Sequence, residues 1–352
     1  MKPQRQLHAF SEPMKAAFRT NLLAWYEEHA RDLPWRKNRD PYRVWLSEIM
    51  LQQTRVGAVI AHYHEFLRRF PTVQKLAAAR EASVLAAWSG LGYYRRARML
   101  HAAAKVLARD HGGKFPETME GMRELPGIGR YTGAAIASIA FGEPVAVVDG
   151  NVKRVLQRLS GKRMAGEELW EAASGVLAPE RPGDFNQAMM ELGATVCTPR
   201  APTCLTCPVV ELCAARGELA GRPNAVRQIK REIHYALDCR DGKVFLVQRA
   251  RDASLMPGMW EFPEAEGVVA GAGKQQVPRF TRNDKKNGRT QDNPERFLFT
   301  LRHSITVTDY TVKVQRMAAL GEVRGKWISV DRLARLPLTG LARKILRKAD
   351  LL

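Results

Sequence analysis

Glu48 and Asp149 occur in settings where a carboxyl group can take part in catalysis. Glu48 lies in an expected helix from Tyr42 to Gln52, and its neighbours three and four residues away are mostly apolar. These neighbours are Val44, Trp45, Leu51 and Gln52. Burial on such a face raises the pKa of a carboxyl group and keeps it protonated near neutral pH, which suits a general acid. The alternative is a glutamate at the edge of the face that reaches solvent.

Asp149 follows a glycine-rich turn and an extended apolar run. The segment Leu125 to Gly129, LPGIG, places two glycines in a tight hairpin directly before an expected helix from Tyr131 to Phe141. Unpaired backbone N–H groups at that helix start, next to Arg130, suit a phosphate oxygen. The apolar run from Pro144 to Val148 then leads to Asp149 and a basic helix. The alternative is an ordinary turn between helices, with Asp149 as a helix cap.

Four of the five cysteines lie in one short stretch, Cys197, Cys204, Cys207 and Cys213, in the pattern C-x6-C-x2-C-x5-C. Four thiols so close together in an intracellular chain favour a metal site over disulfides. Zinc accepts four sulfur ligands, so the spacing does not exclude it. The wide-narrow-wide spacing differs from the two close pairs of a zinc finger, and we therefore favour a [4Fe-4S] cluster. The fifth cysteine, Cys239, is expected in the core of a strand.

The charge of the chain indicates a polyanionic partner. The 352 residues include 56 Lys and Arg against 36 Asp and Glu, a net charge of +20. This excess is typical of proteins that bind nucleic acid or an anionic membrane face, and we favour nucleic acid. No apolar run approaches the ~20 residues of a membrane span, and the first residues lack the apolar centre of a signal peptide. We expect a cytoplasmic monomer.

The elements that position these residues change type along the chain. Helical periodicity runs through the first two-thirds, and alternation with a period of two begins near residue 232. Further expected helices are Met14–His29, Arg55–Phe70, Ala82–Trp88, Arg95–Asp110 and Gly183–Thr195. Expected strands are Ile233–Cys239, Lys243–Arg249, Phe297–Arg302 and Ile305–Arg316, with a closing helix near Leu341–Leu346. The sequence thus predicts a mainly α domain over residues 1–215, a linker over 216–231, and a smaller α+β domain over 232–352 with a mobile polar loop at 274–296.

Several segments together resemble one protein family. They are LPWR from Leu33, PYRVWLSEIMLQQTRV from Pro41, WSGLGYYRRARML from Trp88, LPGIGRYTGAAI from Leu125, VDGNVKRV from Val148, FNQAMMELGATVCTPRAPTCLTCP from Phe185 and MPGMWEFP from Met256. On these segments the chain resembles the MutY-type adenine DNA glycosylases of the helix-hairpin-helix superfamily. The resemblance covers almost all of the first domain and patches of the second. It implies two helical subdomains, a [4Fe-4S] loop on the four cysteines of residues 197–213, and a Nudix-like second domain.

The resemblance also implies a reaction. Family members flip an adenine opposite 8-oxoguanine or guanine out of duplex DNA and cut its N-glycosidic bond. A glutamate matching Glu48 protonates N7 of the adenine and later assists the attacking water. An aspartate matching Asp149 stabilises the positive charge that develops on the sugar, following the two-carboxylate logic of glycoside hydrolysis. Tyr131 and Asn151 match positions that arrange these two carboxyl groups.

A further set of residues is expected to contact DNA. Gln53 and Thr54 could reach base edges from a helix end, and Tyr93 or Tyr94 could stack on bases while the other packs in the core. The expected contacts in the first domain are Arg36, Gln53, Thr54, Leu91, Tyr93, Gly127, Gly129 and Arg130. In the second domain, His303 and Ser304 are expected to read the lesion. The family carries Phe-Ser-His there, whereas this chain reads Leu-Arg-His-Ser from Leu301.

One position predicts that the enzyme does not cut the DNA backbone. Superfamily members with this second activity carry a lysine where this chain has Tyr131, because a Schiff base needs an amine. Arg130 cannot replace it, since a guanidinium stays protonated, although Lys153 and Lys162 could support weak cleavage. Two other interpretations stay open: a thymine glycosylase acting on T:G mismatches, and a non-catalytic DNA-binding iron-sulfur protein.

Overall fold

The chain divides into two compact units in the computed structural model, which describes residues 11–217, 219, 229–265, 297–305, 308–317 and 323–352. The first unit comprises Met1–Ala79 and Arg96–Pro223, and the second comprises Arg80–Arg95 and Asn224–Leu352. The loop predicted at 274–296 and most of the linker predicted at 216–231 lie outside the described residues. The domain limits at 215 and 232 stay a prediction.

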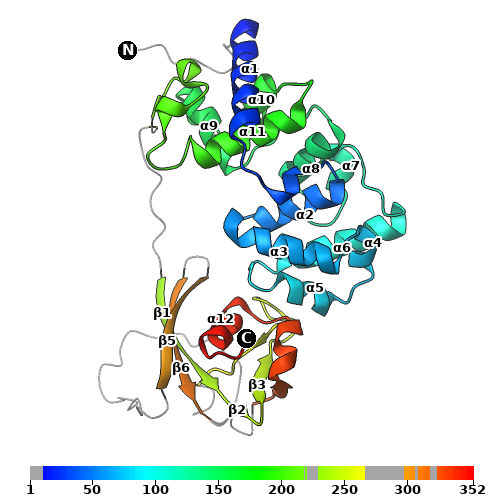
Figure 1. Ribbon diagram of the computed structural model, residues 1–352, viewed down its shortest axis with the longest axis vertical. Coiled ribbons are helices and arrows are strands. Elements are labelled where there is room, and N and C mark those ends of the chain that lie inside the picture. The colour runs from blue at the N-terminus through cyan, green and yellow to red at the C-terminus, as the bar shows by residue number, and fades with distance from the viewer. Residues whose placement is uncertain (1–10, 218, 220–228, 266–296, 306–307, 318–322) are drawn as a thin grey trace. The chain divides into compact units, whose positions relative to one another are not determined.

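The first unit consists of helices connected by short turns (Figure 1). Before the glycine hairpin these are α1 (Glu12–His29), η2 (Pro34–Arg36), α2 (Pro41–Leu51), α3 (Val56–Arg69), α4 (Val73–Ala77), α6 (Arg95–Asp110) and α7 (Met119–Arg123), with α5 (Glu81–Trp88) assigned to the second unit. After it come α8 (Arg130–Ile136), the π-helical turn η3 (Ala137–Phe141), α9 (Gly150–Ser160), α10 (Glu167–Val176), α11 (Pro182–Thr195), η4 (Cys204–Thr206) and η5 (Val210–Leu212). The predicted mainly helical domain is confirmed. Within the described residues, no helix is both long and apolar enough to cross a membrane.

Local signals begin the two helices that carry the candidate catalytic carboxyls. Helix α2 has Asp40 as its N-cap, whose side chain accepts a hydrogen bond from the Arg43 N–H at 2.8 Å, and Pro41 at its first position. Helix α9 begins after Asp149, whose side chain accepts from the Val152 N–H. Asp149 therefore does cap a helix, as the alternative interpretation had it, and this leaves its second carboxylate oxygen available for other contacts.

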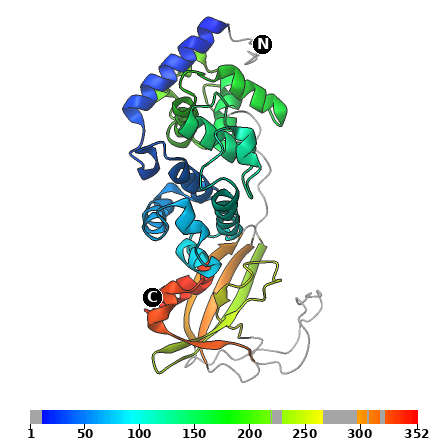
Figure 2. The same cartoon turned by 90° about the vertical axis from the view of Figure 1, so that its right-hand side faces the viewer.

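Helix α11 packs against α1, α9 and η3 (Figures 1 and 2). Its crossing with α9 is close because residue 193 is glycine: a Cβ there would lie 2.5 Å from the Asn151 Cβ. On the same helix, the buried Asn186 amide donates to the Ser138 hydroxyl and the Val145 carbonyl and accepts from the Val147 N–H. The two hydrogen bonds with Val145 and Val147 fix the extended segment that leads to Asp149, and the third joins this segment's partner Asn186 to η3.

The second unit packs two small sheets and a helix around one core. One sheet has the order β1-β6-β5, with β1 (Ile229–Leu237) parallel and β5 (Phe297–Ile305) antiparallel to β6 (Thr308–Arg316). In the other, β3 (Lys243–Gln248) pairs with β2 (Cys239–Arg240), β4 (Trp260–Glu261) and β7 (Lys326–Ser329). A short turn, η7 (Val330–Arg335), and α12 (Gly340–Lys348), red in Figure 2, complete the unit. The predicted α+β class is confirmed.

Two expectations for the strands are wrong in detail. The strand expected over 305–316 is two elements, because β5 runs on to Ile305 and β6 starts at Thr308. Cys239, expected in the core, is exposed. Strand β1 ends at Leu237, and β2 is a two-residue strand with both side chains exposed. Asp238, between the two strands, is the buried residue and pairs with Arg240.

Candidate active site

Glu48 is buried in the first unit and hydrogen-bonded to Tyr131. Its side chain on α2 leaves the residue 7% exposed, and the Tyr131 hydroxyl on α8 lies 2.7 Å from its Oε2. Burial raises the pKa of Glu48 to about 7; the Tyr131 hydrogen bond lowers it, the Asp149 charge raises it and Arg36 lowers it. The carboxyl group is thus poised to hold a proton near neutral pH, as the apolar spacing of the sequence predicted.

The Asp149 side chain accepts hydrogen bonds from two protein groups, whereas the Glu48 side chain accepts one from Tyr131. Its Oδ1 accepts from the Val152 N–H at 2.7 Å, and its Oδ2 accepts from the Asn151 amide at 3.0 Å. Burial raises the pKa of Asp149 above its usual value, and hydrogen bonds from Val152 and Asn151 and the charge of Arg154 offset part of that rise. Two amide donors that favour the ionised form distinguish Asp149 from Glu48. The two carboxyl groups are therefore suited to opposite roles, one as an acid and one as an anion.

Replacing Glu48 with glutamine is expected to stabilise the folded protein above neutral pH. The folded-state pKa of about 7 exceeds the value near 4.5 of an unfolded glutamate, so the folded state holds a proton that the unfolded chain releases between these values. The native glutamate thus destabilises the fold increasingly as pH rises through that window. The gain from Glu48→Gln should be on the order of 3 kcal/mol at pH 8 and less than half of that at pH 5.5.

Urea unfolding of both proteins at pH 8 and pH 5.5 measures this difference. An equal effect of the substitution at the two pH values would contradict a raised pKa for Glu48.

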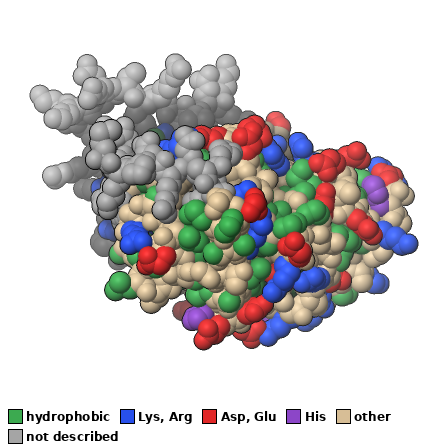
Figure 3. Space-filling view, turned by 90° about the horizontal axis from the view of Figure 1, so that it is seen from above, with side chains coloured by type: hydrophobic (Ala, Val, Ile, Leu, Met, Phe, Trp, Pro, Cys, Tyr) green, Lys and Arg blue, Asp and Glu red, His purple; other side chains and the backbone are tan. Residues whose placement is uncertain are grey.

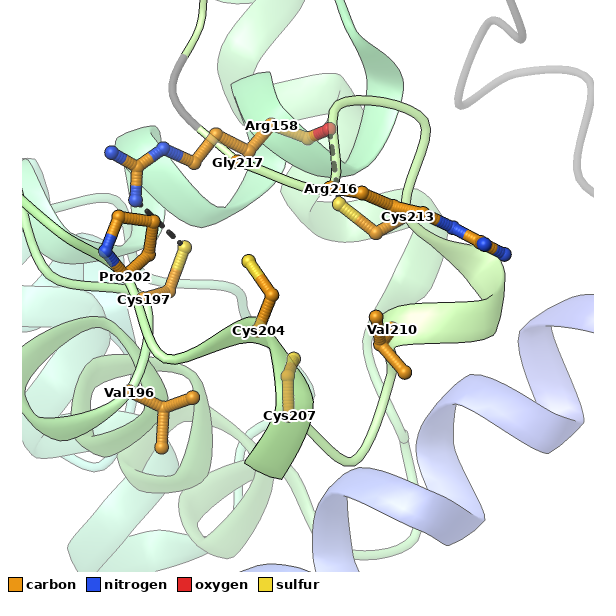
Figure 4. A pocket seen from close by; sticks show the side chains of 10 residues that line it. All are labelled: Arg158, Val196, Cys197, Pro202, Cys204, Cys207, Val210, Cys213, Arg216 and Gly217. Atoms are coloured by element: carbon orange, nitrogen blue, oxygen red, sulfur yellow. Dashed lines mark hydrogen bonds between the residues drawn. The ribbon is translucent and has the colours of Figure 1, made fainter.

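The four predicted cysteine ligands line one cavity, and Figure 4 shows their thiols directed toward the space between them. These are Cys197, Cys204, Cys207 and Cys213. In the part of the chain that the structure describes, no three His, Cys, Asp or Glu side chains are grouped so that they could hold one metal ion. Four thiol groups around one cavity are a donor set that suits both a four-coordinate zinc ion and a [4Fe-4S] cluster.

Helix α9 connects the cysteine loop to Asp149. The Arg158 guanidinium, on a residue only 5% exposed, donates to the Cys197 Sγ at 3.3 Å and to the Thr198 carbonyl at 2.7 Å. One turn earlier, Arg154 donates to the Cys197 carbonyl at 2.7 Å and to the Asn151 Oδ1 at 2.8 Å. Asn151 in turn donates to Asp149. Hydrogen bonds thus run from the cysteine loop to the carboxylate along one helix.

The glycine hairpin has the expected form. Gly127 has φ +78°, and a Cβ there would lie 2.4 Å from the Met99 Cβ, so only glycine fits. Gly129 precedes α8 with no side-chain cap. Arg130 is already engaged: its guanidinium lies 2.6 Å from the Glu167 carboxylate and 4.1 Å from the Trp170 ring centre. A DNA phosphate at Arg130 would have to compete with Glu167.

The other predicted DNA contacts differ in exposure. Gln53 is exposed with φ +53°, and Tyr93 is 48% exposed with φ +47°, a backbone region that is uncommon outside glycine. Leu91 and Tyr94 are buried, at 5% and 3% exposure, so Tyr94 is the core member of the tyrosine pair. The Thr54 hydroxyl accepts from Arg96, whose guanidinium also binds the carbonyls that end α2.

The predicted lesion-reading residues belong to the second unit. His303 is half-buried in β5, and burial and then the charge of Lys344 lower its pKa. The exposed Ser304 hydroxyl lies 2.5 Å from the Asp309 carboxylate in β6. His303 and Ser304 are neighbours on one strand of the second unit. Within the first unit, the structure brings Glu48, Tyr131, Asp149 and Asn151 together as a carboxyl site.

Three residues of α11 beside this site were not identified from the sequence. Asn186 fixes the segment before Asp149, Met190 places its sulfur 3.3 Å from the Tyr131 hydroxyl, and Glu191 is completely buried. The local signal was limited to the polar and polarisable side chains within the otherwise apolar helix segment FNQAMMELGA. Their partners lie in distant segments, so the sequence did not reveal the contacts.

Known proteins resemble this chain over much of its length. The model of the HhH-GPD superfamily of base excision DNA repair proteins matches residues 46–179. An adenine DNA glycosylase of Mus musculus is 41% identical over 321 residues, covering 73% of this chain and 62% of that protein. An adenine DNA glycosylase of Buchnera aphidicola subsp. Acyrthosiphon pisum is 31% identical over 302 residues, covering 83% and 85%. This chain thus spans less than two-thirds of the mouse protein but most of the bacterial one.

A solved structure has the same helical fold. A thermostable thymine-DNA glycosylase matches with a TM-score of 0.55 and 31% identity, over 57% of this chain and 96% of that one. The buried glutamate, the helix-capping aspartate and the glycine hairpin all lie within residues 46–179, the range that the HhH-GPD model matches. Together with the similarity to the Buchnera protein over most of both lengths, these matches show that the chain belongs to the adenine DNA glycosylase family of the HhH-GPD superfamily.

Proposed function

We propose that this protein is a monofunctional adenine DNA glycosylase that acts on adenine opposite 8-oxoguanine or guanine in duplex DNA. The observation that carries the proposal is the pair formed by Glu48, which is buried with its pKa raised to about 7, and a hydrogen-bonded Asp149 in the first unit. The mouse and Buchnera relatives carry the name adenine DNA glycosylase, which supports adenine as the base removed.

In the first step, the Glu48 carboxyl group transfers its proton to N7 of a flipped adenine. Protonation makes adenine a better leaving group, and the bond between N9 and the sugar C1′ breaks. The Tyr131 hydroxyl, 2.7 Å from Oε2, holds the carboxyl group in position. Its own pKa is raised by burial, so Tyr131 stays a neutral hydrogen-bond donor.

In the second step, the Asp149 carboxylate stabilises the positive charge that the sugar acquires as the bond breaks. Asn151 and the Val152 N–H hold the carboxylate oxygens while helix α9 fixes its backbone. Water then adds to C1′, and the Glu48 carboxylate accepts its proton, which restores the starting state.

Strand cleavage is not part of the proposed activity. A lyase step needs an amine that forms a Schiff base with the sugar, and residue 131 carries a phenol instead. In this structure the Tyr131 hydroxyl donates a hydrogen bond to the Glu48 carboxyl group and lies 3.3 Å from the Met190 sulfur. The product is therefore an abasic site in an intact strand.

Electrostatic attraction for DNA is expected from the net charge of +20. On the face of the molecule in Figure 3, Lys and Arg side chains are interspersed with Asp and Glu side chains, so the positive excess does not gather there. The glycine hairpin and the exposed Gln53 and Tyr93 are the proposed DNA contacts. His303 and Ser304 are the proposed contacts with the oxidised guanine.

We assign a [4Fe-4S] cluster to Cys197, Cys204, Cys207 and Cys213, where it would order the loop that Arg158 and Arg154 attach to α9. Protein purified without oxygen is expected to contain about four iron and four sulfide per chain. Cys207→Ser should lower both contents and loosen the loop, whereas Cys239→Ser, at the exposed cysteine outside the site, should leave them unchanged. Zinc at one equivalent, with no iron, would contradict the assignment.

A thymine glycosylase acting on T:G mismatches is a second candidate. The observation that favours it is the structural match to a thymine-DNA glycosylase at 31% identity. That match covers 57% of this chain, whereas the Buchnera adenine glycosylase matches over 83%. The similarity to an adenine glycosylase therefore extends over more of the chain than the similarity to the thymine glycosylase.

Single-turnover base release from four duplexes separates these functions. The duplexes differ only in the central pair, A:8-oxoguanine, A:G, T:G or C:8-oxoguanine, and each is assayed with and without alkali. The expected result is adenine release from the first two, with strand cleavage only after alkali. Thymine release would establish the second candidate, and tight binding without release of any base would establish a non-catalytic protein.

A further inference from the structure

The segment that leads to Asp149 is hydrogen-bonded to a side chain of helix α11. Residues 142–149 all belong to the described part of the chain and form neither helix nor strand. The buried Asn186 accepts from the Val147 N–H at 3.2 Å and donates to the Val145 carbonyl at 2.8 Å. These are the two kinds of bond that a neighbouring strand would supply, and they hold the backbone two residues before Asp149.

A second contact of α11 lies just after Asp149. Gly193, two helical turns beyond Asn186 and therefore on the same face of α11, packs against Asn151. A Cβ at residue 193 would lie 2.5 Å from the Asn151 Cβ and 3.0 Å from its Cα, so a methyl group fits there only if Asn151 moves. The Gly193 carbonyl also accepts from the Arg154 Nη2 at 2.6 Å. The Asn151 amide in turn donates to the Asp149 Oδ2 at 3.0 Å.

Helix α11 is itself held firmly at two places. At its start, a Cβ at Gly183 would lie 2.6 Å from the Ser138 carbonyl oxygen, so the helix packs directly against η3. In its last turn, the completely buried Glu191 carboxylate accepts from the Arg31 Nε at 2.6 Å and Nη2 at 2.8 Å. A fork-shaped charged pair of this kind fixes orientation as well as position. The helix is therefore a rigid support for the residues that it contacts.

We propose that α11 acts as a brace for the Asp149 carboxylate, with Asn186 and Gly193 as positioning residues on its two sides. Asn186 fixes the backbone that leads into residue 149, and Gly193 lets Asn151 lie where its amide meets Oδ2. The inference rests on the proposed function, because the carboxylate needs this placement only if it faces the charged sugar. A misplacement of about 1 Å in a catalytic group costs up to about 10²-fold in rate.

Asn186→Leu removes both hydrogen bonds to the segment and keeps the approximate volume of the side chain. Single-turnover adenine release should fall by about 10²-fold, while affinity for duplex DNA stays close to that of the wild type. Gln157→Met is the matched control. The Gln157 amide also donates to a loop carbonyl, that of Met164 at 2.8 Å, but this loop follows α9, whereas residue 149 precedes it. The control should release adenine at nearly the wild-type rate.

Gly193→Ala tests the other side of the brace and leaves Asn186 untouched. The added methyl group has to displace Asn151, so the rate should again fall. Gly175→Ala on α10 should not change it, because a Cβ at residue 175 meets no described atom within 4 Å. This pair keeps the proposal testable if Asn186→Leu does not fold. Equal rates for the two alanine variants would overturn the brace.

A double variant shows whether α11 acts through Asp149. In an Asp149→Asn protein the carboxylate is already absent, so adding Asn186→Leu should slow base release much less than it does in the wild type. An effect on folding alone would be the same in both backgrounds. Equal further losses in the two backgrounds would therefore refute a positioning role.

Affinity for two modified duplexes separates this inference from the proposed function. One duplex carries a cationic pyrrolidine in place of the target nucleoside, which mimics the charged sugar, and the other carries a neutral tetrahydrofuran of similar shape. The wild type should bind the pyrrolidine duplex more tightly. Loss of most of that preference in Asn186→Leu and Gly193→Ala would support the brace even if the base released were not adenine.

Two outcomes of this binding experiment would overturn the brace. A preference that the wild type shows and both folded variants keep in full would refute the brace and leave the proposed function intact. A wild-type protein that bound the two duplexes equally would contradict the role of Asp149 itself, and the brace with it.

Discussion

Asp149→Asn is expected to lower the single-turnover rate of adenine release by about 10³-fold, the scale of losing one preorganised charge from a transition state. The substitution removes the carboxylate that stabilises the developing positive charge on the sugar. It keeps the other role of the residue, because asparagine also caps helices well and can accept the Val152 N–H hydrogen bond. DNA affinity should therefore stay close to that of the wild type.

Asp40→Asn is the matched control for this substitution. Asp40 caps α2 as Asp149 caps α9, accepting from the Arg43 N–H at 2.8 Å, but it has no place in the carboxyl site. Its variant should excise adenine at nearly the wild-type rate. If Asp149→Asn also retained near-normal turnover with unchanged DNA affinity, the role of Asp149 would be structural only.

Glu48→Gln is expected to lower the same rate by about 10²- to 10⁴-fold, the usual contribution of a positioned general acid. The wild-type rate should also fall as pH rises through about 7, because that is where Glu48 loses its proton. The residual activity of the glutamine variant should lack this alkaline limb. Rapid-quench assays between pH 5.5 and 9 measure both effects.

Glu143→Gln serves as the control for Glu48. Glu143 is half-buried in the same unit and accepts the Met119 N–H at 2.7 Å, so its substitution disturbs a comparable hydrogen bond away from the site. Wild-type behaviour is expected of it. An alkaline limb that persisted unchanged in Glu48→Gln would assign the titration to another group.

The sequence predicted the parts of the site that depend on local signals. The burial of Glu48 followed from the apolar residues three and four positions away, and the capping role of Asp149 followed from its place before a basic helix. The four cysteines proposed to hold a cluster were recognisable because all lie within one short segment, and the structure places them around one cavity. The local order of residues within one element or one short segment was sufficient for each of these predictions.

The rest depends on contacts between distant segments. Glu191 pairs with arginines 155 and 160 residues away, and nothing in its own helix indicates which partners reach it. The parallel pairing of β1 with β6 joins strands separated by more than 70 residues, so alternation alone could not give the sheet order. Cys239 shows the same limit, because its exposure depends on where β1 ends and β2 begins.

The most direct test of the mechanism compares two duplexes that differ in one atom of the target base. One carries adenine opposite 8-oxoguanine, and the other carries 7-deazaadenine, in which carbon replaces the N7 that Glu48 is proposed to protonate. The wild-type protein should bind both duplexes with similar affinity, release adenine, and release 7-deazaadenine at least about 10³-fold more slowly, as expected when acid catalysis is lost. Release of both bases at equal rates would show that no proton reaches N7 and would contradict the role of Glu48.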